Sequence, residues 1–217
     1  MLLGHVAVAL SARPVAPRIP TAVLLGAPLL VDLLWPLFLL LGLEHVQINP
    51  GNTAYTPLAF THYPITHSLL GGVAWAALAG GLYFVLSKYR RGAFVVAGLV
   101  VSHWVLDWVV HRPDLPLYPG SAKYGLGLWH SVAGTVLLEA ALLMAGAALY
   151  LRATRALDRR GVLAFWLLIG LLVMVVVGTI LGPPPPDETS LAVGALLLWA
   201  VPLWGIWIDR HRAPVPA

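Results

Sequence analysis

The sequence contains no cysteine and very little charge. Without cysteine, disulfide bonds and thiolate metal ligands are both excluded. Only 10% of the 217 residues are charged and 59% are hydrophobic, whereas a soluble domain carries about 25% charged residues. A soluble chain of this composition has too few charged groups to cover its own surface. Together with a mean hydropathy of +0.85, this indicates a protein whose main solvent is lipid.

Short segments of alternating polarity, which are typical of transmembrane β-barrels, are also missing. Instead, six stretches of about 20 residues run almost without charge, and each is long enough to cross about 30 Å of hydrocarbon as a helix. They cover residues 21–43, 66–86, 93–110, 126–151, 162–181 and 191–208. Four consecutive prolines at 183–186 cannot be helical and predict a stiff connector before the last span. The sequence therefore predicts an all-α integral membrane protein.

The first twelve residues form an apolar run that is too short to cross a bilayer and ends at Arg13 and Pro14. The run lacks the basic residues that precede the apolar core of a signal peptide. We therefore expect a short re-entrant or half-inserted N-terminal helix in addition to about six transmembrane helices. We expect one polytopic membrane domain over residues 1–217, in which residues 1–151 carry the site and residues 152–217 supply two further packing helices.

The basic residues predict how the chain is oriented. All but two of the 13 lysine and arginine residues lie in alternate loops: Arg13, Arg18, Lys88, Arg90, Arg91, Arg152, Arg155, Arg159, Arg160, Arg210 and Arg212. The positive-inside rule places these loops and the C-terminus in the cytoplasm, so we expect a multi-pass protein of the cell inner membrane. The net charge of +4 then reflects membrane-edge loops, and we expect no nucleic-acid partner.

The densest group of ionisable residues lies in the third predicted span. His103, Asp107 and His111 are four residues apart, and each step of four drifts by only about 40° around a helix. The three side chains therefore share one face and can present imidazole and carboxylate groups to one point, as metal-binding helices do. A His–Asp hydrogen bond that joins two helices is the structural alternative.

Other ionisable residues are expected at a similar depth. A rise of about 1.5 Å per residue places Asp32, His103, Asp107 and Glu139 in the middle to outer half of the bilayer. His5 reaches this level only if the N-terminal segment enters the membrane from the cytoplasmic side. Polar groups buried at one depth favour a site over separate helix contacts.

A second group precedes the second span. His62 and His67 flank Pro64, which interrupts any helix, and Thr66 is the expected N-cap of the following helix. Both histidines are therefore expected at the outer mouth of the span, near the level of His111. Two imidazoles around a rigid turn beside the membrane are candidates for metal ligands.

The donor atoms of these candidates are imidazole nitrogens and carboxylate oxygens, without sulfur. This set suits divalent metals, and the share of histidine favours zinc or manganese. Glu139 or Asp114 would serve as a general base or would orient a ligating histidine. The tyrosines and Trp129 of the outer loops are expected to form an aromatic belt at the membrane interface.

Four elements occur in a fixed order along roughly the first half of the chain. His5 lies in an apolar helix, Asp32 follows in the next one, and then come His62-Tyr63-Pro64-Ile65-Thr66-His67-Ser68-Leu69 and Ser102-His103-x-x-x-Asp107. This order resembles the YdjM-like inner-membrane metal-dependent hydrolases, whose patterns are His-Arg-x-x-Thr-His-Ser-Leu and Ser-His-x-x-x-Asp. The resemblance implies a metal site. Tyr63 replaces the usual Arg, and Leu34 stands where a second acid is expected, so one carboxylate of a two-metal site is missing.

Three functions remain open from the sequence. The first is a metal-dependent hydrolase in the outer half of the bilayer, which acts on a lipid-linked or phosphoester substrate. Its expected metal ligands are His5, Asp32, His62, His67, His103, Asp107 and His111, and its expected catalytic groups are Glu139 and Asp114. The second is a cation or proton transporter, and the third is a membrane scaffold joined by polar contacts between helices.

Overall fold

The computed structural model describes residues 1–215 and contains six helical segments that are long and apolar enough to cross a membrane. They are α2 (Thr21–Leu40), α3 (Leu69–Ser87), α4 (Arg90–Val110), α5 (Val132–Ala153), α6 (Arg159–Leu181) and a final segment, Glu188–His211. The final segment consists of α7 (Glu188–Ala195), the 3₁₀ helix η2 (Leu196–Trp199) and α8 (Ala200–His211). The prediction of an all-α, multi-pass membrane protein is confirmed. The four prolines lie outside any helix, as predicted.

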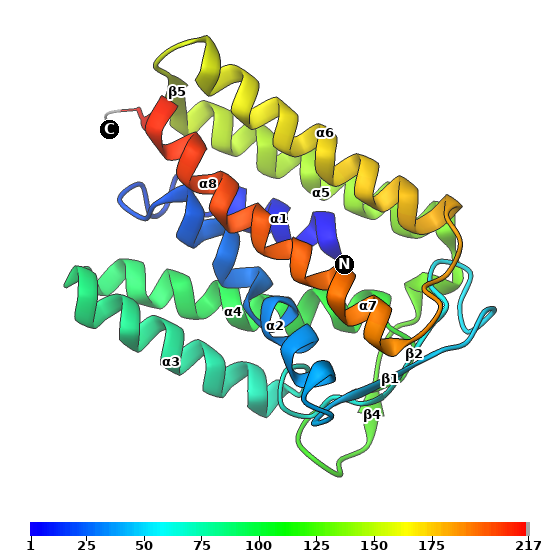
Figure 1. The fold of residues 1–217 in the computed structure, drawn as a ribbon. Helices are drawn as coiled ribbons and strands as arrows, with labels where there is room; N and C mark the ends of the chain where they lie inside the picture. Colours follow the sequence, from blue (N-terminus) through cyan, green and yellow to red (C-terminus); the bar gives the residue numbers. More distant parts are fainter. Residues whose placement is uncertain (216–217) are drawn as a thin grey trace.

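The short N-terminal helix is also confirmed. Helix α1 (Leu2–Ser11) is about 15 Å long at 1.5 Å per residue, which is half of a membrane crossing. It packs against α2, α4, α5 and α6, so it lies inside the bundle (Figure 1). Val6, Ala9 and Leu10 are at most 1% exposed. Helix α1 therefore fills the centre of the bundle from one end to about the middle.

Two predicted boundaries are wrong, for local reasons. The N-cap of α3 is Ser68, whose hydroxyl accepts the Gly71 N–H, because the Thr66 hydroxyl instead donates to Glu44. The span predicted to begin at residue 126 begins at Val132. The residues before it include the short 3₁₀ helix η1 (Leu128–His130), and Ser131 caps α5.

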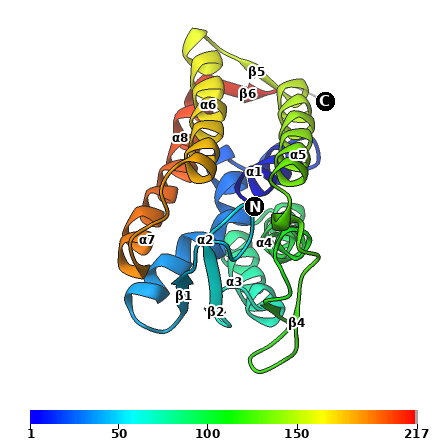
Figure 2. The ribbon, with the colours of Figure 1, turned by 90° about the vertical axis from the view of Figure 1, so that its right-hand side faces the viewer.

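The loops gather at two opposite ends of the bundle. At one end, which we call the basic end, lie the connections α1–α2, α3–α4 and α5–α6 and the pairing of β5 (Thr154–Ala156) with β6 (Arg212–Pro214) (Figure 1). At the other, the hairpin end, β1 (His45–Ile48) pairs with β2 (Leu58–His62), and β3 (Leu115–Pro116) pairs with β4 (Lys123–Tyr124) (Figures 1 and 2). The predicted basic loops therefore share one end of the molecule.

Helix α1 sits against α5 at a close contact that needs glycine. A Cβ atom on Gly146 would lie 2.4 Å from the carbonyl oxygen of Ala7, which is backbone and cannot move aside like a side chain. Small residues that let helix backbones approach are typical of membrane helix packing, where burial in lipid gives no hydrophobic driving force. Gly146 thus sets how closely α1 approaches α5.

We predict that Gly146→Leu lowers the stability of the protein by at least about 1–3 kcal/mol, the usual cost of overpacking, because α1 is pushed away from α5. Thermal unfolding in mild detergent measures the change. Gly98→Leu on α4 is the matched control, since a Cβ there meets nothing within 4 Å. Equal melting temperatures of the two variants would contradict the role of Gly146.

Candidate metal centre

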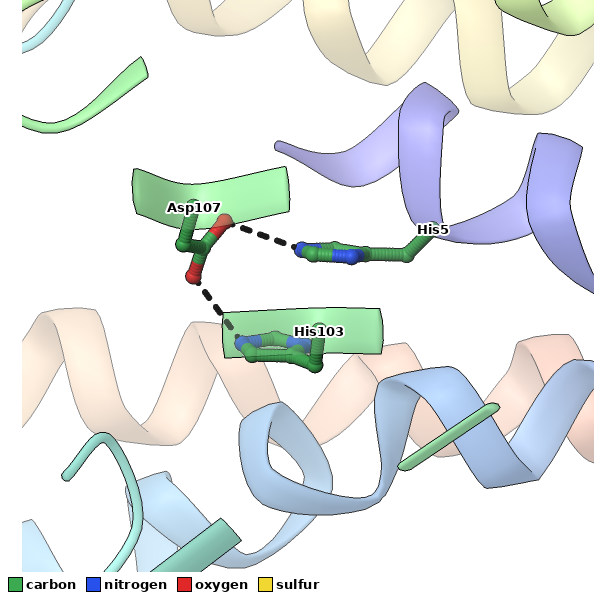
Figure 3. A group of neighbouring side chains, drawn as sticks. All are labelled: His5, His103 and Asp107. Carbon is green, nitrogen blue, oxygen red and sulfur yellow. Dashed lines mark hydrogen bonds and ion pairs between the residues drawn. The ribbon is translucent and has the colours of Figure 1, made fainter. Parts of the chain in front are cut away.

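The inward face of α4 carries the first two members of the centre. His103 and Asp107 are each 2% exposed, and they belong to a buried stripe that includes Val96, Val100 and Val110. His103 Nε2 lies 3.0 Å from Asp107 Oδ2 (Figure 3). This nitrogen has no hydrogen-bond partner among the described residues, so the short contact lacks hydrogen-bond geometry. The shared face predicted from the four-residue spacing is confirmed.

Helix α1 adds His5 from the centre of the bundle. His5 Nε2 lies 3.1 Å from Asp107 Oδ1, and its ring stacks on the His103 ring at a centroid distance of 3.9 Å (Figure 3). The Met1 amino nitrogen lies 3.0 Å from the same Asp107 oxygen. The entry of α1 from the basic end thus brings His5 to the depth that the sequence required of it.

Helix α2 and the turn before α3 add the remaining two members. His67 Nε2 lies 3.3 Å from Asp32 Oδ1, and His103 Nε2 lies 3.7 Å from the same oxygen. His67 is 4% exposed. Of the four residues expected at one depth, Asp32, His103 and Asp107 therefore come together, and His67 joins them in place of Glu139.

These side chains form two groups of three whose ligand atoms lie within 4.8 Å of one another: His5 with His103 and Asp107, and Asp32 with His67 and His103. Both groups need His103. A neutral imidazole offers one lone pair, so His103 Nε2 can bind only one ion. The geometry therefore fits one metal ion shared by α1, α2, α3 and α4 better than two ions.

The spacing of the donor atoms also fits an ion. Metal–ligand distances of 2.0–2.1 Å around a tetrahedral zinc ion imply ligand–ligand distances of about 3.3–3.4 Å. The contacts to Asp32 at 3.3 and 3.7 Å are longer than ordinary hydrogen bonds, which are about 2.9 Å. The donors are thus arranged as ligands that surround a common point.

Hydrogen bonds fix which nitrogen of each histidine faces the centre. His103 Nδ1 lies 2.8 Å from the carbonyl oxygen of Pro28, which can only accept, so Nδ1 carries the proton. His67 Nδ1 lies 2.7 Å from Thr66 Oγ1, and the Thr66 hydroxyl donates to Glu44. In both rings Nε2 is left with its lone pair toward the centre, which is the usual arrangement of metal-binding histidines.

Glu44 supports this arrangement and was missed in the sequence. It is 0% exposed, and its carboxylate accepts the backbone N–H groups of Ile65 and Thr66 and the Thr66 hydroxyl. It therefore holds the turn that places His67. The available signal was that Glu44 is the single acid in the loop between the first two predicted spans.

His111 lies at the edge of the centre and belongs to neither group of three. Its Nε2 is 3.7 Å from Asp107 Oδ2, and its Nδ1 is 2.9 Å from Asp114 Oδ1. Asp114 also accepts the hydroxyl of Tyr63, and burial raises the pKa of Tyr63, which keeps this donor protonated. Asp114 therefore orients His111, one of the two roles expected for it.

Two of the expected belt aromatics are buried beside the centre. Trp129 is 7% exposed and packs on His111 at a centroid distance of 4.1 Å. Tyr63 is 1% exposed, and Phe60 lies between the two rings. Tyr118 and Tyr124, at 55% and 43% exposed, remain at the surface. The hairpin-end loops thus cover the centre with an aromatic wall, and the belt interpretation is wrong for Tyr63 and Trp129.

Two expected site residues lie elsewhere. Glu139 is buried, but its Oε2 accepts the N–H of Leu3, so it caps the start of α1 and belongs to neither group of three. His62 is exposed on β2, where it pairs across the strands with His45, because the hairpin directs it away from the bundle. The structure therefore corrects both assignments: Glu139 positions α1, and His62 is a surface residue.

Asp32 is the member of the centre whose side chain is most accessible to solvent. Its side chain is 24% exposed, whereas those of His5, His67, His103 and Asp107 are 0–4% exposed. The neighbours of Asp32 on the same face of α2, Pro28 and Leu25, are buried. Asp32 therefore lies on the bundle side of α2 and is the most exposed member of the centre.

Comparison with models of known families, with curated proteins and with solved structures finds no match for this chain. The function is therefore inferred from the geometry of the centre.

We predict that Glu44→Ala loosens the turn that carries His67. Two buried backbone N–H groups lose their acceptor, at about 1–3 kcal/mol each. Hydrogen exchange at Ile65 and Thr66, with thermal unfolding, measures the effect. Glu188→Ala is the control, because Glu188 is also an acceptor at the hairpin end, for Val46 N–H, but is 33% exposed. Unchanged exchange at Ile65 in Glu44→Ala would refute the role of Glu44.

Proposed function

We propose that this chain is a membrane-embedded, metal-dependent hydrolase that holds one divalent ion, zinc or manganese, between α1, α2, α3 and α4. The observation that carries the proposal is His103 Nε2. This nitrogen is buried and without a hydrogen-bond partner among the described residues, yet three side chains from three other segments converge around it. Leaving a buried polar atom unpaired costs free energy, so we expect His103 Nε2 to have a partner such as a cation.

The chemistry of the donor set supports the choice of metal. Imidazole nitrogen and carboxylate oxygen donors, without sulfur, suit zinc or manganese. When bound, such an ion acts as a Lewis acid and lets water serve as a hydrolytic nucleophile near neutral pH. The chain supplies His103 and His67 with fixed tautomers, and Asp32, the accessible member, is placed to accept a proton from an incoming group at its carboxylate.

The position of the centre favours a substrate that belongs to the membrane. The centre lies inside the bundle, and aromatic rings from the hairpin-end loops pack beside it. By the positive-inside rule the basic end faces the cytoplasm of a cell with an inner membrane, so the centre faces the outer half of the bilayer. A lipid-linked or phosphoester substrate fits this depth. The ordered resemblance to YdjM-like hydrolases points the same way.

A transport function is less well supported. The stretch between the centre and the basic end is filled by buried apolar side chains, among them Leu25, Leu29, Val96, Val100 and Leu143. A path for a cation or a proton needs polar groups or water along its length. A scaffold held together by His–Asp hydrogen bonds accounts for the 3.1 Å contact of His5 with Asp107, but the contacts of Asp32 with His67 and His103 are longer than ordinary hydrogen bonds.

We predict that the protein, purified in mild detergent without chelator or histidine tag, binds about one equivalent of zinc or manganese. His103→Ala and Asp107→Ala lose it, because each removes a donor needed by the centre. Elemental mass spectrometry measures the metal, and thermal unfolding shows whether the fold is retained. His62→Ala is the matched control, since His62 is exposed on β2. If the folded wild type binds no metal after reconstitution, the hydrolase proposal is wrong and the scaffold function replaces it.

A graded effect is predicted for His111→Ala. His111 contacts Asp107 but lies outside both groups of three, so the variant should retain the metal with an affinity about 10–100-fold lower, as expected for a residue that orients a ligand. Titration with a competing chelator measures the affinity. Complete loss of the metal, equal to that of His103→Ala, would show that His111 is itself a ligand.

A further inference from the structure

A cavity at the hairpin end has no part in the centre itself. It has a volume of about 510 Å³ and lies between the loop at residues 50–58 and the last turns of α6 with the connector that follows. Its lining includes Tyr55 and Thr56 from the loop, Gly178 and Ile180 from α6, and Leu191 from α7. The volume is within the range of about 300–1,000 Å³ that is usual for small-molecule sites. Hollows along the α3–α4 hairpin contain no residue of the centre.

The lining of this cavity is uncharged and has few free hydrogen-bonding groups. None of the described residues that line it is charged. Two of its threonine hydroxyls already donate hydrogen bonds, Thr53 to the Thr56 carbonyl and Thr179 to the Val175 carbonyl. The lining offers an ionised ligand no opposite charge in exchange for its lost hydration. The lining suits an uncharged hydrocarbon chain.

The cavity opens next to the lipid-facing side of α6. Val175 lines it and is 46% exposed. In a membrane-spanning helix, an exposed valine faces acyl chains. A chain can thus enter the cavity from the bilayer past Val175 and Thr179, whose hydroxyl is bonded to the Val175 carbonyl.

The inner wall of the cavity leads to the centre through three contacts. Tyr55 stacks on Trp129 at a centroid distance of 6.1 Å and an angle of 4°, and its backbone N–H donates to the Trp129 carbonyl. Trp129 packs on His111, which lies 3.7 Å from Asp107. Burial, with the nearby Glu139 carboxylate, raises the pKa of Tyr55, so its hydroxyl stays neutral. Two stacked rings therefore separate the cavity from the edge of the centre.

We infer that this cavity holds the uncharged hydrocarbon chain of a lipid substrate whose polar group is directed toward the metal centre. That the chain belongs to a substrate rests on the proposed function. The cavity can hold a hydrocarbon chain whether or not a metal is bound. The inference narrows the substrate class to molecules with a membrane-soluble chain. A small water-soluble phosphoester has nothing to place there.

The test uses the full chain in vesicles of dioleoylphosphatidylcholine with a diacylglycerol that carries a diazirine in one acyl chain. Photolysis and peptide mass spectrometry measure adducts on residues 50–58. We expect saturable labelling that unlabelled dioleoylglycerol competes away. Gly178→Leu fills the cavity and should lower this labelling at least about tenfold, because a leucine side chain takes the volume that the acyl chain needs.

Gly170→Leu is the matched control. Both glycines lie on α6, both are exposed, and a Cβ at either meets nothing within 4 Å, but Gly170 does not line the cavity. It should label within about twofold of the wild type. Ala54→Trp, which fills the cavity from the loop, replaces Gly178→Leu if that variant does not fold.

Labelling of residues 50–58 that rises linearly with the probe, or that persists in Gly178→Leu, would overturn the inference. The metal content of the same samples separates the two proposals. If the wild type contains metal but shows no saturable labelling, the inference about the cavity is wrong and the hydrolase proposal stands. Saturable labelling without metal establishes the chain site and removes the hydrolase proposal.

Discussion

The high cost of an ionisable group in hydrocarbon is the constraint on which the rest of this structure depends. Asp32, Asp107 and three histidines lie at mid-depth in a chain that has only 10% charged residues. None of them faces the lipid, and each finds at least one of the others. Six spanning segments would suffice to make a bundle, but they do not by themselves surround these groups with partners. The half-length helix α1 completes the enclosure, because it brings His5 against Asp107 and His103.

The position of α1 follows from features distributed over several helices. Gly146 on α5 lets the α1 backbone approach closely, and Glu139, two turns earlier on the same helix, accepts the N–H of Leu3 at the start of α1. A helix that begins inside a bundle has unpaired N–H groups away from water, which need an acceptor. Glu139 is thus buried for a structural reason, and its carboxylate fixes how far α1 extends toward the centre.

The parts of the structure that depend on local sequence could be predicted, and those that depend on packing between segments could not. Six spans follow from hydropathy, and the common face of His103 and Asp107 follows from helix periodicity. The direction of His62 depends on the pairing of β1 with β2, which the sequence did not indicate. Glu44 is the single acid of its loop, but this does not reveal its partner, because Glu44 acts on a turn 21 residues away along the chain. Equal depth suggested a catalytic or ligand-orienting role for Glu139, but depth does not say which way a side chain points.

The shared use of His103 also limits the chemistry available to the centre. With one lone pair at His103 Nε2, the two groups of three cannot each hold a separate ion. If the proposed hydrolase acts on a phosphoester, a single ion would not clamp both the attacking and the leaving oxygen, as paired metals do, and the chain would have to supply the remaining positioning. The centre, the aromatic wall and the neutral cavity all lie in the half nearer the hairpin end, whereas the half nearer the basic end holds apolar side chains and a separate buried polar group of Arg13, Thr21 and Tyr150. Binding energy from a chain in the cavity would then hold the polar group of the substrate beside the ion, which replaces part of what a second ion would do.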